Sequence, residues 1–259
     1  MDLQLNNRLA LVSGSTAGIG YSIAEALLRE GARVIVNGRS QASVDAAVAR
    51  LGAGAIGFAG DLSKAGDAET VVHNYPDIDI LGNNLGIFEP KAFEDIPDED
   101  WLRFFEVNVL SGARLARLVL PGMKRRNWGR ILFISSESGV QIPAEMVHYG
   151  MTKSAQIAIA RGIAESVAGS GITVNSVLPG PTRSRGVEDF VQALAGDSGQ
   201  SFDEFEKEFF EKVRPTSLIK RFATTEEVAA MVTYLCSPLA SATTGAALRV
   251  DGGTVKSAF

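Results

Sequence analysis

Tyr149 and Lys153 are the two residues of this sequence whose types and spacing most directly permit proton-transfer chemistry. They stand four positions apart in a segment with a helical pattern, which places both side chains on one face of the helix. A free tyrosine has a pKa of about 10, so its phenolate must be stabilised before it can act as a base near neutral pH. An ammonium group about 5 Å away, at an effective dielectric constant of about 20, supplies about 3 kcal/mol of that stabilisation. The pair therefore predicts an acid/base centre, whereas either residue alone is usually a packed aromatic or a solvated lysine.

Ser135 and Ser136 are candidate hydrogen-bond donors for the same centre. They end an apolar run that starts at Arg130, and the 13 positions from Ser136 to Tyr149 allow the chain to return the start of the helix to the end of that run. Side chains alternate along a strand, so Ser135 is expected to point away from the side that Ser136 faces. Ser136 is therefore the favoured serine, with Ser138 as a further competitor.

A glycine-rich loop follows the first apolar run and leads directly into a helical pattern. Its glycines, Gly14, Gly18 and Gly20, allow a sharp turn and a close backbone approach to a pyrophosphate. The charge of that group would lie at the positive end of the following helix. A chance cluster is the alternative in a chain with 27 glycines, but the position between the first strand and the first helix is the context that dinucleotide binding requires.

The end of the second apolar run, Val36-Asn37-Gly38-Arg39, indicates which dinucleotide binds. No carboxylate stands there to hydrogen-bond a free ribose 2′-hydroxyl, and the guanidinium of Arg39 suits a 2′-phosphate instead. This favours NADP(H), with NAD(H) as the alternative, and the competing interpretation of Arg39 is a solvated surface arginine. Asp61 ends the third run, where it either accepts a hydrogen bond from an adenine amino group or caps the next helix.

Short apolar runs alternate with helical patterns along the whole chain. Several runs are apolar almost throughout, as strands covered on both faces must be. The alternation predicts an α/β fold: a Rossmann-type, doubly wound parallel sheet of about seven strands with helices on both faces. The expected strands are Leu9–Ser13, Arg33–Asn37, Ala55–Ala59, Ile78–Gly82, Arg130–Ser135, Ile172–Leu178 and Ala247–Val250.

The domain organisation is simple. No linker rich in Pro, Gly or Ser divides the chain, and its length fits one buried core, so residues 1–259 are expected to form a single domain. One irregular stretch, at about 183–221, is polar and contains several phenylalanines. It predicts a helical insertion between the sixth and seventh strands.

Taken together, these motifs resemble the short-chain dehydrogenase/reductase family. In chain order they are Gly14-x3-Gly18-x-Gly20, Asp61, Asn83-Asn84-Leu85-Gly86, Asn108, Ser136, Tyr149-x3-Lys153, Pro179-Gly180 and Asp251-Gly252-Gly253. The resemblance implies that Tyr149 is the catalytic acid/base and that Ser136 polarises a carbonyl oxygen. It further implies that Lys153 binds the nicotinamide ribose and that Asn108 holds a water in a proton relay.

The same resemblance implies the reaction and the coenzyme contacts. The expected reaction is hydride transfer between a nicotinamide coenzyme, NADP(H) favoured over NAD(H), and a small secondary alcohol or ketone. The departures from the family pattern, Ser13, Leu85 and Ser184, remove no needed functional group. The expected coenzyme contacts are Gly14, Ser15, Thr16, Gly18, Ile19, Gly20, Arg39, Asp61, Leu62, Asn84, Gly86, Tyr149, Lys153, Pro179, Gly180 and Thr182.

Two other functions compete with this one. A non-catalytic dinucleotide-binding or regulatory subunit of the same fold has no need of Tyr149. Epimerase or dehydratase chemistry on nucleotide sugars usually needs a longer substrate domain than 259 residues allow. The intact set of catalytic residue types therefore favours the oxidoreductase.

The insertion at about 183–221 follows Pro179-Gly180 and is therefore expected to cover the substrate. Its phenylalanines suggest an apolar pocket wall, although phenylalanines at helical spacing are more often core packing. Sequence does not reveal whether Glu137 and His148 point into the pocket. An anionic or polyhydroxylated substrate is suggested by three arginines that are otherwise ordinary surface residues, Arg183, Arg185 and Arg214.

Composition and charge argue against several other classes of protein. A net charge of −5 and a pI near 5.2 disfavour a nucleic-acid or anionic-membrane partner. There is no apolar run of about 18 residues and no N-terminal signal pattern, so we expect a soluble, cytoplasmic protein. One cysteine and two histidines argue against a metal site. The family resemblance suggests a homotetramer, or a homodimer, built through helices near 101–126 and 149–168 and the C-terminal strand.

Overall fold

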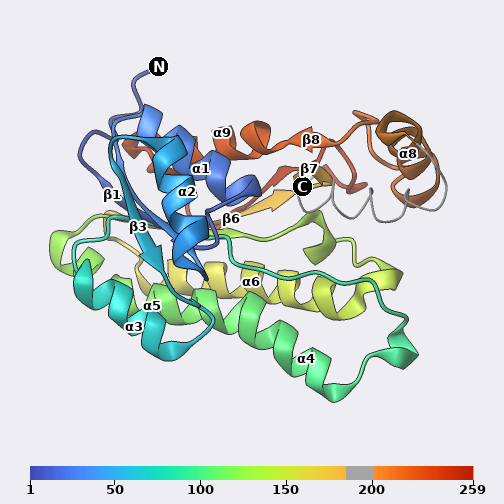
Figure 1. The fold of residues 1–259 in the computed structure, drawn as a ribbon, viewed down its shortest axis with the longest axis horizontal. Coiled ribbons are helices and arrows are strands. Elements are labelled where there is room, and N and C mark those ends of the chain that lie inside the picture. The colour runs from blue at the N-terminus through green and yellow to red at the C-terminus, as the bar shows by residue number, and fades with distance from the viewer. Residues whose placement is uncertain (185–200, 259) are drawn as a thin grey trace.

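The computed structural model describes residues 1–184 and 201–258. Seven short apolar segments form one parallel sheet in the order β3-β2-β1-β4-β5-β6-β9, which confirms the predicted Rossmann-type sheet (Figure 1). Each predicted strand is present, with ends that agree within two residues. The strands are β1 (Leu9–Val12), β2 (Arg33–Gly38), β3 (Ala55–Ala59), β4 (Ile80–Asn83), β5 (Gly129–Ile134), β6 (Ile172–Pro179) and β9 (Ala247–Val250).

Helices cover both faces of this sheet, as the strands' apolar sequences require. On one face lie α1 (Gly18–Arg29), α2 (Gln41–Leu51) and α9 (Thr225–Cys236), whose buried side chains share one apolar cluster with β1, β2 and β6 (Figure 1). On the other face lie α3 (Ala65–Asn74), α5 (Ser111–Arg126) and α6 (Val147–Ser166), which share a second cluster. The short helix α4 (Asp98–Phe104) runs through a π-helical turn, Phe105–Leu110, into α5.

The strand order places the functional crevice. The chain winds outward from β1 to β3 and then returns to lay β4 on the other side of β1, so the order reverses between β1 and β4. In open parallel sheets, ligands bind at the carboxyl ends of the strands beside such a reversal. The loops that follow β1, β4, β5 and β6 therefore meet at one edge of the sheet.

The predicted insertion begins and ends in a second, two-stranded sheet. Strand β7 (Thr182–Arg183) pairs in parallel with β8 (Ala223–Thr224). Between them the structure describes α8 (Phe202–Glu208) and a π-helical turn, Phe209–Val213. The aromatic rings of this part pack on one another, with the ring centroid of Phe222 lying 5.0 Å from that of Phe209 and 5.8 Å from that of Phe202. These phenylalanines form a small core of their own. Core packing was the alternative to a pocket wall in the sequence analysis.

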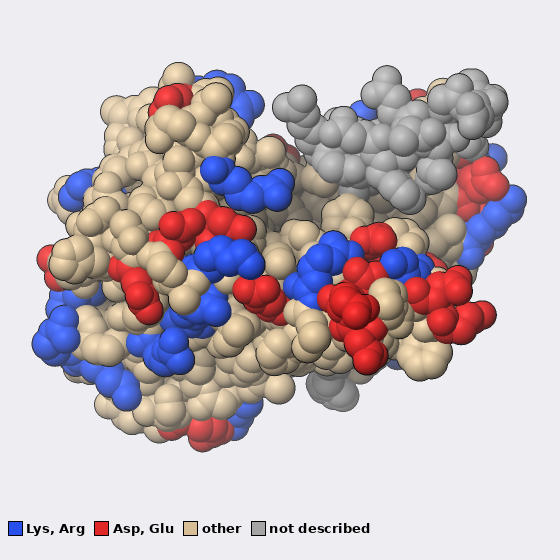
Figure 2. All heavy atoms as spheres, turned by 60° about the horizontal axis from the view of Figure 1, so that its bottom comes forward, with Lys and Arg blue, Asp and Glu red and all other residues tan. Residues whose placement is uncertain are grey.

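The surface mixes charges of both signs. Figure 2 shows Lys and Arg side chains lying among Asp and Glu side chains on the face turned toward the viewer. Near α4, Arg103 pairs with Glu89 at 2.9 Å and with Asp100 at 2.8 Å, and Lys91 pairs with Asp100. Within the part of the chain that the structure describes, no helix combines the length and the apolar character needed to cross a membrane.

Candidate active site

The loop from Ser13 to Gly20 presents an open helix end to the crevice. Gly14 and Gly18 have φ angles of +61° and +58°, a conformation that glycine adopts without strain. The N-cap of α1 is Ala17, which has no capping side chain, and the first turn contains no acidic residue. The first backbone N–H groups of α1 therefore remain available to an anion, which the helix dipole also favours.

Gly20 is required by close packing beneath this loop. A Cβ atom at this position would lie 2.5 Å from Nδ2 of Asn84 and 2.5 Å from the carbonyl oxygen of Gly14. Asn84 follows β4 and donates hydrogen bonds from Nδ2 to the carbonyl oxygens of Ser13 (3.1 Å) and Gly14 (3.0 Å). The side chain of Asn84 thus fixes the shape of the glycine loop from the neighbouring strand.

Asn37 braces the same loop from the other side, a role that sequence reasoning missed. Its Oδ1 accepts a hydrogen bond from the backbone N–H of Gly14 at 3.1 Å, and its Nδ2 donates to the carbonyl oxygen of Gly60 at 3.0 Å. Asn37 is buried at the end of an otherwise apolar strand. That polar interruption is the signal that could have identified it, because buried polar side chains are nearly always hydrogen-bonded.

Arg39 stands exposed just beyond β2. Among residues 1–184 and 201–258, its guanidinium has no hydrogen-bond or ion-pair partner, so its donors remain available. Asp61 accepts hydrogen bonds through Oδ1 from the backbone N–H (3.0 Å) and hydroxyl (2.7 Å) of Ser63, which is a local turn contact. The side chain of Leu62 is buried in the core beneath α3.

The other predicted coenzyme residues lie around the same loops. Ser15 is fully buried and donates a hydrogen bond to the carbonyl oxygen of Val12 at 2.7 Å, so its side chain supports the loop. Thr182 donates to the carbonyl oxygen of Gly180 at 2.9 Å, just beyond Pro179 at the end of β6. Thr16 and Ile19, the remaining predicted residues, belong to the glycine loop itself. This loop approaches the chain after β6, where a Cβ at Gly18 would lie 3.7 Å from Cβ of Ser184.

Ser136, Tyr149 and Lys153 lie together at the carboxyl end of β5, where the start of α6 returns to the sheet. Ser136 lies near enough to Tyr149 to lower the pKa of its phenol. Lys153 Nζ lies 5.5 Å from the Tyr149 ring centroid and donates a hydrogen bond to the carbonyl oxygen of Ile134 at 2.9 Å. Ser135 points the other way, donating at 2.8 Å to the carbonyl oxygen of Lys153.

Asn108 lies in the π-helical turn before α5, across the Gly86 backbone from Lys153. Its Oδ1 accepts a hydrogen bond from the backbone N–H of Ile87 at 2.7 Å, and its Nδ2 donates to Oγ1 of Thr152 at 3.0 Å. A Cβ at Gly86 would lie 3.5 Å from Oδ1 of Asn108 and 3.6 Å from Nζ of Lys153. The loop after β4 is therefore held against the catalytic residues by the side chain of Asn108.

Gln156 connects Lys153 to Asn108, a link that sequence reasoning missed. Its Oε1 accepts a hydrogen bond from Lys153 Nζ at 3.3 Å, and its Nε2 donates to the backbone carbonyl oxygen of Asn108. The side chain of Gln156 is buried within a helix face that otherwise packs on the sheet. Its position three residues after Lys153 was a signal in the sequence, since such residues share a helix face.

Glu137 and Arg214 form a charged pair beside Ser136, and both side chains are largely buried. Glu137 Oε2 accepts hydrogen bonds from the hydroxyl of Ser136 and from the backbone N–H of Ser138, the latter at 2.9 Å. Arg214 Nε contacts Glu137 Oε1 at 3.4 Å, and another of its nitrogens, Nη1, donates to the carboxylate of Glu145 at 3.0 Å. Glu137 thus contacts Ser136, while Arg214 reaches Glu137 from the described part of the insertion.

Comparison with known sequences points to one family. The model of a family described as enoyl-(acyl carrier protein) reductase matches residues 14–255. An uncharacterised oxidoreductase of Bacillus subtilis, YvrD, is 50% identical over 99% of this chain and 100% of its own length. The D-beta-hydroxybutyrate dehydrogenase of Cupriavidus necator is 35% identical over 97% of this chain and 99% of its own length.

Solved structures agree with the sequences. L-sorbose reductase from Gluconobacter frateurii, complexed with NADPH and L-sorbose, superposes with a TM-score of 0.93 and 30% identity over 99% of this chain and 100% of its own. A short-chain dehydrogenase/reductase family protein superposes with a TM-score of 0.85 and 32% identity over 98% of each chain. The chain is a short-chain dehydrogenase/reductase. It is therefore an oxidoreductase with the Rossmann-like fold of that family.

The charges around the active site of this short-chain dehydrogenase/reductase correct one expectation from the sequence. Burial, reinforced by the nearby carboxylate of Glu137, raises the pKa of Tyr149 above its ordinary value, although Ser136 and Arg214 oppose this. Burial also lowers the pKa of Lys153 to about 8. Lys153 was expected to lower the pKa of Tyr149, but its ammonium is directed to Ile134 and Gln156. Among the protein groups alone, desolvation of the phenol therefore outweighs stabilisation by the ammonium.

The side chains that the sequence suggested as further substrate contacts are partly engaged with other residues of the protein. His148 is fully buried, with its ring 4.0 Å from that of Phe104, so it packs in the core of this dehydrogenase/reductase. Arg183 lies over the ring of Phe202 at 4.1 Å, and Arg214 is paired as described. Arg185 lies outside the described residues. The described arginines thus offer less positive charge to an anionic substrate than the sequence suggested.

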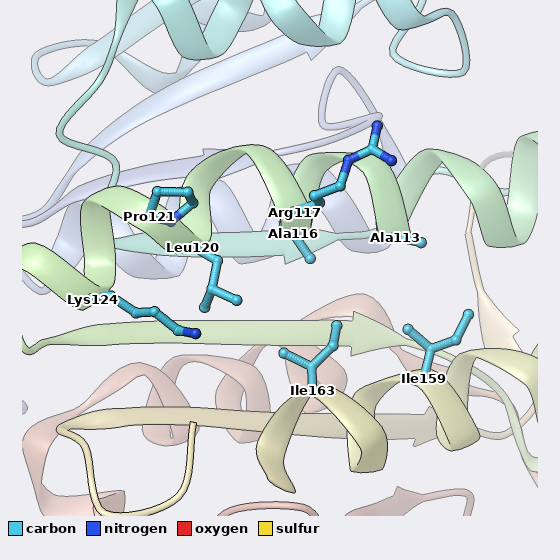
Figure 3. A pocket seen from close by; sticks show the side chains of 8 residues that line it. All are labelled: Ala113, Ala116, Arg117, Leu120, Pro121, Lys124, Ile159 and Ile163. Atoms are coloured by element: carbon cyan, nitrogen blue, oxygen red, sulfur yellow. The ribbon is translucent and has the colours of Figure 1, made fainter. Parts of the chain in front are cut away.

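A groove of about 320 Å³ lies between α5 and α6 of the dehydrogenase/reductase (Figure 3), and Ser136, Tyr149 and Lys153 are not among the residues that line it. Ile159 and Ile163 from α6 face Leu120 and Ala116 from α5 across it, and Arg117 and Lys124 stand at its margin. Its lining is largely apolar, whereas the catalytic corner of the crevice is polar and charged. Among the residues that the structure describes, no group of His, Cys, Asp and Glu side chains could hold a metal ion.

Proposed function

We propose that this protein interconverts secondary alcohols and ketones by hydride transfer with a nicotinamide coenzyme, NADP(H) being favoured over NAD(H). The observation that carries this proposal is the meeting of Tyr149, Ser136 and Lys153 at the carboxyl end of β5. A dinucleotide-binding subunit without catalytic activity would not need a partly buried tyrosine and a buried lysine at this point. The length of the chain and its single domain also disfavour nucleotide-sugar epimerase chemistry.

The residues present fit a dinucleotide. The uncapped start of α1 and the Gly20 packing provide backbone N–H groups and close approach for the pyrophosphate, which Gly14, Ser15, Thr16, Gly18 and Ile19 would surround. Asp61 and Leu62 would lie near the adenine, and Asn84, Gly86, Pro179, Gly180 and Thr182 near the nicotinamide half. When bound, the nicotinamide supplies or accepts the hydride.

Three side chains of this protein would handle the substrate oxygen. Tyr149 donates its phenolic proton to that oxygen during ketone reduction and takes a proton from the hydroxyl during alcohol oxidation. Ser136 hydrogen-bonds the same oxygen as its negative charge develops. Lys153 holds the coenzyme ribose and, through its ammonium, stabilises the phenolate that is left after proton donation.

Asn108 is proposed to complete a proton relay behind these residues. Its side chain secures the loop after β4. Its backbone carbonyl accepts a hydrogen bond from Gln156, whose side-chain oxygen in turn accepts one from Lys153. A water held at this carbonyl could return a proton to Tyr149 by way of Lys153. The raised pKa of Tyr149 favours the protonated phenol at neutral pH, which suits the direction of ketone reduction.

Two observations support NADPH as the favoured coenzyme. Arg39 is exposed at the end of β2 with its donors available, where the 2′-phosphate of NADPH would lie. The solved L-sorbose reductase that this chain resembles is complexed with NADPH, and so is actinorhodin polyketide ketoreductase. NAD(H) stays the alternative because the preference for NADP(H) in this region depends on Arg39.

The assembly and location of the protein are proposals of the same kind. The apolar groove between α5 and α6 is a surface that a second copy could cover, so we favour a homotetramer, or a homodimer, built on these helices and the C-terminal strand. The described part of the insertion at 183–221 reaches Glu137 through Arg214, which supports a substrate-covering role. We place the protein in the cytoplasm.

A Tyr149→Phe variant tests the proposal. The phenyl ring can keep the edge contact with Phe88, while the proton donor is lost. We expect ketone-dependent NADPH oxidation to fall about 1,000-fold with little change in NADPH binding, because general acid catalysis is worth about 100- to 10,000-fold. The rate is followed spectroscopically and NADPH binding by fluorescence. Full turnover in the variant would refute the assignment of Tyr149.

A further inference from the structure

The buried carboxylate of Glu137 has no role in the proton transfer proposed above, yet it lies beside the reacting groups. Its side chain is 6% exposed, and buried carboxylates are costly unless hydrogen-bond donors surround them. Three donors serve Oε2: the hydroxyl of Ser136, and the backbone N–H and hydroxyl of Ser138. Oε1 receives only a long contact of 3.4 Å from Arg214 among the described residues.

Ser136 cannot serve Glu137 and a substrate at the same time. A serine hydroxyl carries one hydrogen, and in this structure it is directed to the Glu137 carboxylate. Polarising a carbonyl oxygen requires the same hydrogen to turn toward the substrate. Substrate binding therefore removes one donor from a buried carboxylate, which is unfavourable unless the substrate supplies a replacement.

A hydroxyl group on the carbon next to the carbonyl can supply that replacement. Its oxygen and the carbonyl oxygen sit on neighbouring carbon atoms, so while the carbonyl accepts from Ser136 the hydroxyl can donate to Glu137. Resting on the proposed function, we infer that Glu137 binds this hydroxyl and that the enzyme acts on α-hydroxyketones and the matching vicinal diols. Plain ketones leave the carboxylate one donor short.

The neighbouring charges disfavour a keto acid in the same position. Arg214, whose guanidinium contacts Glu137, is already paired with Glu137 and Glu145. A substrate carboxylate would therefore meet the negative charge of Glu137, and the guanidinium of Arg214, being paired, would not be available to neutralise it. A neutral hydroxyl donor suits an acceptor-only carboxylate, and the site thus selects polyhydroxylated over anionic ketones.

The reaction needs no reductant besides NADPH and no proton donor besides Tyr149. In reduction, the carbonyl π bond breaks, the carbonyl carbon gains the hydride of NADPH, and the oxygen gains the proton of Tyr149, giving a vicinal diol and NADP⁺. The hydroxyl bound to Glu137 keeps its own proton throughout. Glu137 is therefore a binding and specificity residue, and the transferred proton still comes from Tyr149.

Matched ketones test this inference on the purified protein with NADPH. Hydroxyacetone and methoxyacetone carry an electron-withdrawing oxygen on the same carbon, but only hydroxyacetone has a hydrogen to donate. Acetone lacks the oxygen, and acetoacetate adds a carboxylate. We expect kcat/KM for hydroxyacetone to exceed that for methoxyacetone by about 100-fold, and acetoacetate to be the poorest substrate, because sites built to bind a hydroxyl reject analogues without one.

Variants assign the preference to Glu137. Glu137→Gln should lower the ratio of hydroxyacetone to methoxyacetone kcat/KM about 10-fold, since a charged acceptor becomes neutral. Glu145→Gln removes the other carboxylate that contacts Arg214 and should keep the wild-type ratio. A wild-type ratio near one, or a ratio that survives Glu137→Gln, would overturn the inference. Thermal melting identifies a misfolded variant, in which case the wild-type ratio alone decides.

The same panel separates this inference from the proposed function. Reduction of acetone or methoxyacetone without any preference for hydroxyacetone leaves the proposed function standing and removes the role of Glu137. No reduction of any of the four ketones with NADPH or NADH counts against both. Strong preference for hydroxyacetone, lost only in Glu137→Gln, supports both.

Discussion

Two corners of the crevice are built in opposite ways. The coenzyme corner, comprising residues 13–20, 37–39 and 84–86, is held by hydrogen bonds between asparagine side chains and the backbone and by the close approach permitted at Gly20. The catalytic corner, comprising residues 135–138, 149–156 and Arg214, is held by buried charged side chains that contact one another. Under the proposed function, shape would therefore control coenzyme binding, whereas charge would control proton transfer and substrate choice.

The largest effect within the coenzyme corner should come from adding one methyl group to it. In Gly20→Ala the new Cβ would lie 2.5 Å from both Asn84 Nδ2 and the Gly14 carbonyl oxygen, so the loop must shift. We expect about 100-fold weaker NADPH binding at every pH, since overpacking costs about 1–3 kcal/mol. Gly162→Ala is the matched control, because a Cβ there meets nothing within 4 Å. Unchanged NADPH affinity in Gly20→Ala would show that shape does not control this corner.

Arg39 is the charged exception in the coenzyme corner and should matter for one coenzyme only. Arg39→Ala should raise KM for NADPH about 10-fold or more while leaving KM for NADH nearly unchanged, because only NADPH carries the 2′-phosphate. Steady-state kinetics with both coenzymes provide the measurement. Equal effects on the two would overturn the NADP(H) preference.

Charge variants of the catalytic corner should move the pH profile in opposite directions. Glu137 raises the pKa of Tyr149 and Arg214 lowers it, so Glu137→Gln should lower that pKa and Arg214→Met should raise it. Alcohol oxidation needs the phenolate and increases as pH rises. Its rising limb should therefore shift by about half to one pH unit, to lower pH in Glu137→Gln and to higher pH in Arg214→Met. Shifts in the same direction would contradict this electrostatic description.

Gln156 should give the smallest effect, because it acts on Lys153 without touching the substrate. Gln156→Leu removes the acceptor for Lys153 and the donor to the Asn108 carbonyl. We expect kcat to fall about 3- to 10-fold with NADPH affinity nearly retained. In Gln156→Glu, an acceptor for Lys153 remains and its added charge should raise the pKa of Lys153, which a pH profile detects. Wild-type kcat in Gln156→Leu would show that this link does not position the lysine.

The sequence predicted the fold and the turn at the glycine loop well because their signals are local, whereas the coenzyme contacts stay predictions. All seven strands were recognisable as apolar runs, and the strand-to-helix glycine loop contained its own explanation. The family motifs identified Asn84 and Asn108 as candidate site residues, although the contacts of these side chains could not be derived from their spacing. Asn37 was overlooked because its partners, Gly14 and Gly60, each lie 23 residues away.

The catalytic corner was predicted less completely because its charges come from distant parts of the chain. Arg214 lies 77 residues from Glu137, so no local pattern links the two. The direction of the pKa shift at Tyr149 was wrong for the same reason: spacing revealed Lys153, but not the burial of the phenol or the proximity of Glu137. Buried charges are set by the three-dimensional neighbourhood, which a spacing argument does not contain.

Deuterium transfer tests the central claim most directly. The ketone that the enzyme reduces fastest is incubated with NADPH deuterated at C4 of the nicotinamide, in separate reactions for the two faces, and the product is examined by NMR. One of the two labelled coenzymes should place a single deuterium on the new carbinol carbon, in the wild type but not in Tyr149→Phe over the same time. Alcohol product without deuterium from either coenzyme would contradict direct hydride transfer at this site.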